Sequence, residues 1–247
     1  MVVCCCDGSV DGILTAVFEA WSADIRTSRI QVPGESNMEW FAEYVQVDSD
    51  AGKASRVARK VISAMGSDAF QMIYMAAITG AADRGDAILQ FIRKGLRVGP
   101  GIVDDLQDRY VMRVFELRRM AWREYQHYRG FLRFRQQGDY LLAKIEPKND
   151  LTTVLLQFFA DRLSKENFVI ADMTRAKAGV HKRDGGYYIA DIDTEAVRAL
   201  ECSRTEQDIS ELWDIFTKSI AIESRYNPGL QRQNMPLRFR KYMDTSK

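Results

Sequence analysis

The hydrophobic pattern of this chain changes its period near residue 128, and that change is the strongest constraint on the fold. From about residue 50 to residue 127, apolar residues recur three and four positions apart, as on one face of an α-helix. Beyond residue 128, short stretches alternate apolar and polar residues, as in a half-buried β-strand. Two of these stretches are separated by Gln137-Gly138-Asp139, which is typical of a β-hairpin loop. The sequence therefore predicts an α+β fold: a mixed sheet of short strands and hairpins with a large helical block.

The expected elements follow one another without a long linker, a repeat or a low-complexity tract. The expected strands cover residues 2–6, 44–47, 129–136, 140–145, 167–173 and 187–192. Helices are expected from residue 10, at 53–65, 68–79, 86–97, from about 103 to 127, at 151–163 and at 205–226. We therefore expect residues 1–247 to form a single α+β domain, with the helical block at about 50–127 and a basic tail at 227–247.

Composition is that of a folded, water-soluble protein. The 247 residues are 46% hydrophobic, which is enough for a core. No run of about eighteen apolar residues occurs, and the first residues lack the basic start and apolar centre of a signal peptide. The sequence predicts a cytoplasmic protein that does not enter a membrane.

Acidic residues concentrate at the start of the chain and basic residues at its end. Residues 1–50 hold nine Asp and Glu against two Arg, whereas residues 225–247 hold six Lys and Arg against Asp244 alone. The formal net charge of +1 hides this asymmetry. One interpretation is a basic footprint for a polyanion. The other is pairing of the acidic and basic surfaces within the molecule.

The cysteines indicate packing more than metal binding. Cys4, Cys5 and Cys6 are adjacent, so in a strand their side chains alternate between faces and cannot converge on one ion. Cys202 is distant in sequence, and only His127 and His181 could add nitrogen ligands. The sequence predicts buried cysteines in a strand, no metal site and no cofactor.

The first candidate binding segment is the expected strand at residues 129–136. Alternation would place Phe131, Arg133 and Arg135 on one face, preceded by Arg129. An aromatic ring beside guanidinium groups can stack a base and hold its phosphates. A sheet edge whose arginines form salt bridges explains the same pattern, so both interpretations stay open.

The second candidate segment is the tail. It mixes guanidinium groups, side-chain amides and aromatic rings, and its two prolines are expected to discourage regular helix. Such a segment is suited to lie along a polyanion, with the cations neutralising phosphates and the amides reading base edges or sugars. The candidate residues are Gln231, Arg232, Gln233, Arg238, Arg240 and Lys241.

Two further residues could contact an anion or be structural. Arg118 falls within an apolar arc of the long helix, so it either pairs with a buried carboxylate or reaches a pocket for an anion. Ser9 lies in the turn before the first helix, where backbone N–H groups could hold a phosphate. Capping of that helix by Asp7 or Ser9 is the simpler interpretation.

The sequence contains no constellation that names a reaction. Neither histidine accompanies a serine or cysteine motif, and His181 falls in a basic stretch, residues 177–183, that we expect to be a mobile loop able to contact phosphate. One alternative is a metal-dependent DNA-processing enzyme in which Asp7, Asp11 and Asp161 surround a divalent ion. The catalytic residues, if any, stay unknown.

Four segments, taken in order, resemble a bacterial family called "probable DNA metabolism protein", which contains a domain of unknown function. They are Asp7-Gly8-Ser9-Val10-Asp11-Gly12-Ile13-Leu14-Thr15-Ala16-Val17-Phe18-Glu19-Ala20, Arg129-Gly130-Phe131-Leu132-Arg133-Phe134, Phe159-Ala160-Asp161-Arg162, and Asn227-Pro228 through Gln231-Arg232-Gln233 to Met235-Pro236. The chain departs from the family pattern, which has histidine at the position of Phe158 and often of Asn234, and an aromatic residue near Arg240.

The resemblance implies a DNA-repair setting. Members of that family are encoded beside a radical SAM protein proposed to modify or repair DNA, and some are fused to a uracil-DNA glycosylase-like domain. The three-cysteine motif of a radical SAM enzyme is absent from this chain, so radical chemistry would belong to the partner. We therefore expect an accessory protein that binds DNA and acts with a radical SAM partner. A protein–protein interaction module that docks through its tail is a second alternative.

Overall fold

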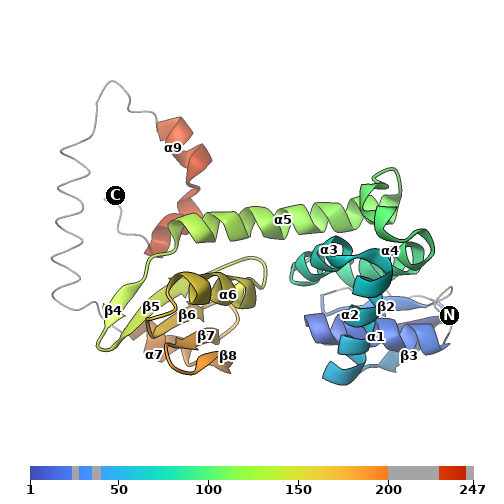
Figure 1. Cartoon of the computed structure of the whole chain (residues 1–247), viewed down its shortest axis with the longest axis horizontal. Helices are drawn as coiled ribbons and strands as arrows, with labels where there is room; N and C mark the ends of the chain where they lie inside the picture. Colours follow the sequence, from blue (N-terminus) through green and yellow to red (C-terminus); the bar gives the residue numbers. More distant parts are fainter. Residues whose placement is uncertain (24–27, 35–39, 200–227, 243–247) are drawn as a thin grey trace. The chain divides into compact units, whose positions relative to one another are not determined.

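A computed structural model describes residues 1–23, 28–34, 40–199 and 228–242 (Figure 1). The chain divides into two compact units, Met1–Arg123 and Glu124–Lys247. The expected helix at 205–226 lies outside the described residues. That the whole chain forms one domain stays a prediction.

Unit 1 begins with a small parallel sheet. Its strands are β1 (Val2–Cys5), β2 (Arg29–Gln31) and β3 (Glu43–Gln46), in the order β2-β1-β3. Parallel neighbours need a crossover, and α1 (Val10–Ala23) lies in the connection from β1 to β2. Helix α1 packs on β1 and also on α2, which follows the sheet in the chain.

The rest of unit 1 is helical. It contains α2 (Ala51–Met65), α3 (Ser67–Ala77), α4 (Arg84–Val98), the 3₁₀ helix η1 (Pro100–Asp104) and the first part of α5 (Arg109–Phe131). The apolar faces of these helices share one core with β1 and β2. Close packing in this core relies on glycine.

Gly85 illustrates this close packing of α4 against β2. A Cβ at Gly85 would lie 2.8 Å from the Cγ2 of Ile30 and 3.0 Å from the carbonyl oxygen of Ile30. These distances are below ordinary van der Waals contact, so the helix can approach the strand only because residue 85 has no side chain.

Unit 2 is built on a five-stranded sheet. The strands are β4 (Arg135–Gln137), β5 (Tyr140–Ile145), β6 (Phe168–Asp172), β7 (Lys177–Lys182) and β8 (Gly186–Asp191), in chain order across the sheet. Only β5 and β6 are parallel. Their crossover contains α6 (Thr152–Arg162), which packs on β6 and β7 (Figure 1).

Three short helices complete the described part of unit 2. They are α7 (Thr194–Ala199), α9 (Pro228–Asn234) and the 3₁₀ helix η3 (Leu237–Tyr242). Tyr242 packs against a small cluster of Leu142, Ala171 and Met173 on the sheet. Helix η3 is therefore part of the folded unit.

The α+β prediction is confirmed, since helices and two sheets of short strands account for both units. Strand β1, helices α1, α2, α3, α4 and α6, and the hairpin around Gly138 all lie close to their predicted ranges. The buried cysteines are confirmed at Cys4 and Cys6, whose side chains lie in the core of unit 1.

The predicted strand at residues 129–136 is wrong. Helix α5 continues to Phe131, and β4 begins only at Arg135. Phe131 is one turn beyond His127 in a helix, and their rings stack with centroids 5.8 Å apart. The apolar and aromatic residues thus keep the helical period past residue 128, and the short alternation at Phe131, Arg133 and Arg135 does not end the helix.

The predicted mobile loop at residues 177–183 is also wrong, because β7 occupies all of it but the last residue. His181 is 7% exposed, its Nδ1 lies 2.9 Å from the carbonyl oxygen of Glu166, and its ring stacks on Phe168. Its imidazole is therefore a packed strand residue. The lysines at both ends of β7 and Gly179 in its middle hid the strand pattern.

The tail prolines do not prevent helix. Pro228 is the first residue of α9, where proline is favoured because the N–H it lacks would have no partner within the helix. Pro236 directly precedes η3, and its carbonyl oxygen accepts a hydrogen bond from the N–H of Phe239. The expectation of an irregular tail is wrong for residues 228–242.

Candidate nucleic-acid interface

The end of α5, the end of β5 and η3 meet in unit 2 and form a shallow depression. We call this region the η3 surface. It comprises Tyr128, Phe131, Leu132, Arg133, Lys144, Glu146, Arg238, Phe239, Lys241 and Tyr242. The η3 surface therefore joins residues from both predicted binding segments, which are about a hundred positions apart in the chain.

Phe239 anchors the tail in the η3 surface. Its side chain is 5% exposed, and its ring contacts three aromatic rings of α5. The centroid distances are 4.9 Å to His127, 5.0 Å to Tyr128 and 6.1 Å to Phe131. Rings at these distances gain from both burial and the geometry of aromatic pairs. Phe131 is consequently half-buried against the tail and is not an open platform for a base.

A buried carboxylate on α5 holds Arg238. Glu124 is 3% exposed, and its Oε1 lies 3.2 Å from Nη1 of Arg238. The same carboxylate accepts hydrogen bonds from the backbone N–H groups of Lys148 and Asn149, both at 2.9 Å, and from Nδ2 of Asn149 at 2.7 Å. Three hydrogen-bond donors and the charge of Arg238 therefore compensate the loss of water around the carboxylate.

A second carboxylate, Glu146, holds the end of η3. It accepts a hydrogen bond from the hydroxyl of Tyr242 at 2.6 Å and pairs with the ammonium group of Lys241. Burial alone would raise the pKa of Glu146, but these two hydrogen bonds outweigh it and keep the pKa below its ordinary value. Burial and the nearby Glu146 raise the pKa of the Tyr242 hydroxyl. Both groups therefore keep their hydrogen-bonded states at neutral pH.

Arg133 is a cation of the η3 surface whose charge no described acidic residue neutralises. Its side chain is exposed, and it has no hydrogen bond or ion pair with any residue in the described part of the chain. Arg238 is 41% exposed and uses one of five N–H groups on Glu124. Both guanidinium groups border the same depression, so one anion could contact the two together.

Arg129 and Arg135 have structural environments. The guanidinium carbon of Arg129 lies 4.0 Å from the ring centroid of Phe158 and 5.4 Å from that of Tyr125, and its Nη1 donates to Gln126. Its Nε is buried without a hydrogen-bond partner among the described residues. Arg135 is half-buried on β4.

The other tail candidates lie on both short helices. Gln231, Arg232 and Gln233 belong to α9, where Arg232 and Gln233 are exposed. Arg240 is half-buried on η3, and its Nε has no hydrogen-bond partner within residues described by the structure. Together, α9 and η3 contain four cations and no acidic residue.

Ser9 is a helix cap. Its Oγ accepts from the N–H of Gly12 at 2.9 Å and donates to Oδ1 of Asp7 at 2.8 Å. The capping interpretation is therefore confirmed. Arg118 is half-buried on α5, and no carboxylate pairs with it among the described residues, so the expected buried ion pair is not seen there.

The three acidic residues of the metal-enzyme alternative do not form one site in either unit. Asp7 and Asp11 belong to unit 1 and Asp161 to unit 2, and each is exposed. Within the described ranges, no three His, Cys, Asp or Glu side chains come close enough to hold a metal ion.

Burial raises the pKa of Cys4 to about 11, which keeps this thiol protonated at neutral pH.

Sequence reasoning missed the acidic residues that hold the tail. Glu124 was detectable, because on α5 it lies one turn from Ala121 and from Tyr128, within the buried stripe. Glu146 follows β5 and carries no such signal.

None of the described helices is long and apolar enough to cross a lipid bilayer.

The fold and the η3 surface define an α+β protein with a basic and aromatic surface built by its own C-terminal tail. Residues 82–244 match the family model described as "Domain of unknown function", DUF4130. The match covers more than half of the chain, so the protein belongs to this family. No curated protein matches the chain. The matched region contains the whole η3 surface.

Proposed function

We propose that this protein is an accessory protein of DNA metabolism that binds single-stranded or damaged DNA through the η3 surface and α9. The observation that carries the proposal is the exposed guanidinium group of Arg133, which pairs with none of the described residues and borders the same depression as Arg238. Arg232, Arg240 and Lys241 extend the positive charge along the tail. Guanidinium groups bind phosphate oxygens through paired N–H donors, which suits this cluster to a nucleic-acid backbone.

The roles of the candidate residues follow from their surroundings. Phosphates are neutralised by five cationic side chains: Arg133, Arg232, Arg238, Arg240 and Lys241. Phe131 and Arg129 hold the surface in shape, because the first packs on Phe239 and the second on Phe158. Gln231 and Gln233 on α9 are amides suited to sugars or base edges.

The resemblance to the family of DNA metabolism proteins supports the proposal that this chain acts together with a partner protein. In this proposal a radical SAM protein supplies the chemistry, and this chain holds the DNA. Copurification of the two proteins after nuclease treatment would separate a protein contact from a contact bridged by DNA. If variants of the tail abolish that complex but leave DNA affinity unchanged, the tail is instead a docking segment for the partner.

The experiment is a titration of fluorescently labelled single- and double-stranded DNA by anisotropy at several salt concentrations. If about five phosphates are neutralised, the logarithm of the association constant should fall with the logarithm of salt with a slope of about −3.5 to −4.5. Arg133→Gln should reduce the slope by about 0.7 to 0.9. An affinity that does not depend on salt would refute the proposal.

Arg183→Gln is the matched control. Arg183 is also an exposed arginine of unit 2, but it lies beyond the end of β7, pairs with Asp184 and does not border the depression. We expect DNA binding by this variant to equal that of the native protein. Equal losses in Arg133→Gln and Arg183→Gln would show a general charge effect and not a site.

A further inference from the structure

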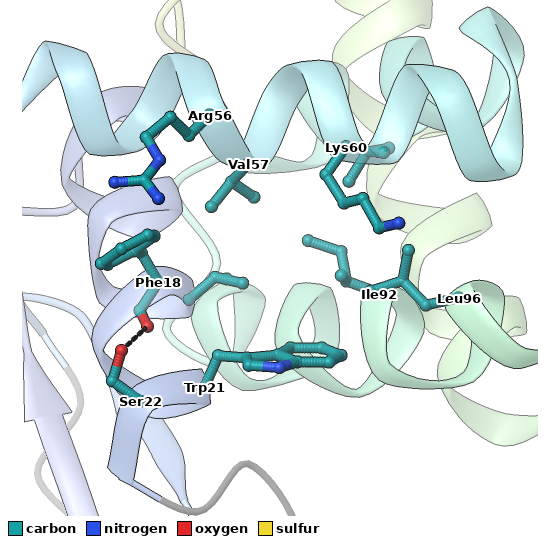
Figure 2. Close-up of a pocket in the computed structure, with 10 residues that line it drawn as sticks. Phe18, Trp21, Ser22, Arg56, Val57, Lys60, Ile92 and Leu96 are labelled. Atoms are coloured by element: carbon teal, nitrogen blue, oxygen red, sulfur yellow. Dashed lines mark hydrogen bonds between the residues drawn. The ribbon is translucent and has the colours of Figure 1, made fainter.

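Unit 1 contains a pocket where α1, α2 and α4 meet (Figure 2). Its volume is about 310 Å³, at the lower end of the range for small-molecule sites. All three helices contribute side chains, and none of them belongs to the η3 surface. The pocket is therefore a feature distinct from the proposed DNA interface.

The inside of the pocket is apolar and has one large flat group. The aliphatic part comes from Val17, Val57, Ile92 and Leu96. Trp21, near the end of α1, lies across the pocket from Val57 and Lys60 (Figure 2) and is 49% exposed. A flat apolar molecule in the pocket would cover this indole ring and gain the free energy of removing it from water.

The edge of the pocket on α2 is cationic. Helix α2 contains four Lys and Arg and no acidic residue. Lys53 is neutralised by Glu19 at 2.6 Å, whereas Arg56 and Lys60 form no ion pair with a described residue. They lie one helical turn apart, and Figure 2 shows the guanidinium group turned toward Phe18 and the ammonium group turned the other way, toward Ile92 and Leu96. An anion at this edge of the pocket would be attracted by both charges.

Arg56 is already held beside the pocket. Its guanidinium carbon lies 4.9 Å from the ring centroid of Phe18, which also lines the pocket. A cation stacked on an aromatic ring loses little further freedom when it binds an anion. The pocket thus combines an apolar interior that includes Trp21 with two cations that form no ion pair with a described residue. These features are complementary to a ligand that is both apolar and anionic.

We propose that this pocket binds a small organic anion with a planar apolar body. The body lies between Trp21 and the aliphatic side chains, and the anionic head lies at the α2 edge of the pocket, where Arg56 or Lys60 contacts it. No covalent step is involved. The site goes beyond the proposed DNA binding and can fail or hold independently of it, because it uses different residues of a different unit.

The test uses a pair of probes that differ in one group. 1-Anilinonaphthalene-8-sulfonate is an anion with a flat naphthalene ring, and N-phenyl-1-naphthylamine is the same ring system without the sulfonate. Binding to the full chain is followed by probe fluorescence and by calorimetry, which gives the stoichiometry. We expect one saturable site whose affinity for the sulfonate is about tenfold higher than for the neutral probe, corresponding to one attractive charge contact.

Variants on α2 separate the site from general charge. Arg56→Gln/Lys60→Gln should weaken sulfonate binding about tenfold and leave the neutral probe unaffected. Arg59→Gln is the matched control, since Arg59 is a cation of the same helix that does not line the pocket. Trp21→Ala should weaken both probes, and thermal melts check that each variant is folded.

Three results would overturn the proposal: no saturable binding of the sulfonate, equal affinities for the two probes, or an Arg59→Gln effect equal to that of Arg56→Gln/Lys60→Gln. The DNA titration with Arg133→Gln is read separately. Loss of DNA binding in that variant with unchanged sulfonate binding would show that the two sites are independent.

Discussion

Glu124→Gln tests whether the buried carboxylate of α5 holds the tail and the loop after β5. The substitution keeps the shape of the side chain but replaces one oxygen by an NH₂ group. Oε1 of Glu124 accepts a hydrogen bond from the N–H of Lys148 and forms an ion pair with Arg238, and Oε2 accepts hydrogen bonds from two groups of Asn149. Whichever oxygen the NH₂ group replaces, its N–H groups then face the N–H groups of Lys148 or of Asn149.

The expected loss can be worked from these contacts. A buried donor left without an acceptor costs about 1–3 kcal/mol, and at least one backbone N–H would be left so. Arg238 can turn to water, so the loss of its partly exposed ion pair adds at most about 1 kcal/mol. We expect Glu124→Gln to destabilise unit 2 by about 1–4 kcal/mol.

Hydrogen exchange measures this loss at the site itself. The amides of Lys148 and Asn149 should exchange faster in Glu124→Gln, together with those of η3. Glu116→Gln is the control, because Glu116 lies on the same helix and forms an exposed ion pair with Arg113 at 3.1 Å. That variant should lose less than about 1 kcal/mol. If the two variants lose equal stability, or the loop amides keep their protection, the reasoning about Glu124 is refuted.

The remaining predictions concern the tail and two glycines. Phe239→Ala should weaken docking of η3 by about 3 kcal/mol. The measurement is the rate of trypsin cleavage at the cations of the tail, which should increase. Leu237→Ala should leave that rate unchanged, because the side chain of Leu237 is exposed. Because hydrogen bonds lower the pKa of Glu146, its contribution is present above the ordinary pKa of glutamate and is lost as pH falls through the lowered value. Hydrogen exchange of η3 should therefore accelerate in acid, and Glu146→Gln should remove that dependence. Gly85→Ala should cost about 1–2 kcal/mol in urea unfolding because Ile30 blocks the new methyl group, whereas Gly130→Ala, with open space around it, should stabilise α5 by up to about 1 kcal/mol. Equal shifts in the two glycine variants would contradict the packing argument.

The sequence predicted the elements whose signals are local. The buried strand before Asp7, the cap at Ser9 and the hairpin at Gly138 each depend on a few adjacent residues. It failed where cations interrupt the apolar period. Lys177 and Lys182 flank β7, and Arg129 and Arg133 flank the end of α5, so the pattern changed before the structure did. Long-range pairing of β7 with β6 and β8 overrides this local composition.

The candidate site could be predicted only in part. The basic and aromatic composition pointed to residues near 131 and to the tail, and the structure brings Phe131 and Phe239 together. The sequence did not indicate that the tail is folded onto the unit, because the acceptors Glu124 and Glu146 lie about a hundred residues before Arg238 and Lys241. Sequence alone therefore left open whether the basic tail lies on a polyanion or pairs with acidic residues of the molecule, and in the structure Arg238 and Lys241 pair with Glu124 and Glu146.

Docking changes what the salt dependence of DNA binding should be. Arg238 and Lys241 already neutralise Glu124 and Glu146, so a phosphate must compete with a carboxylate for each of them. If both cations keep their carboxylates, the number of neutralised phosphates falls from five to three, and the slope for single-stranded DNA becomes about −2 instead of about −3.5. Glu124→Gln removes the competitor of Arg238. If η3 stays docked, that variant should steepen the slope by about 0.7 although it destabilises unit 2. A loss of stability together with a steeper salt dependence is not expected from simple damage to the fold, and it would identify Arg238 as a cation shared between the fold and the DNA.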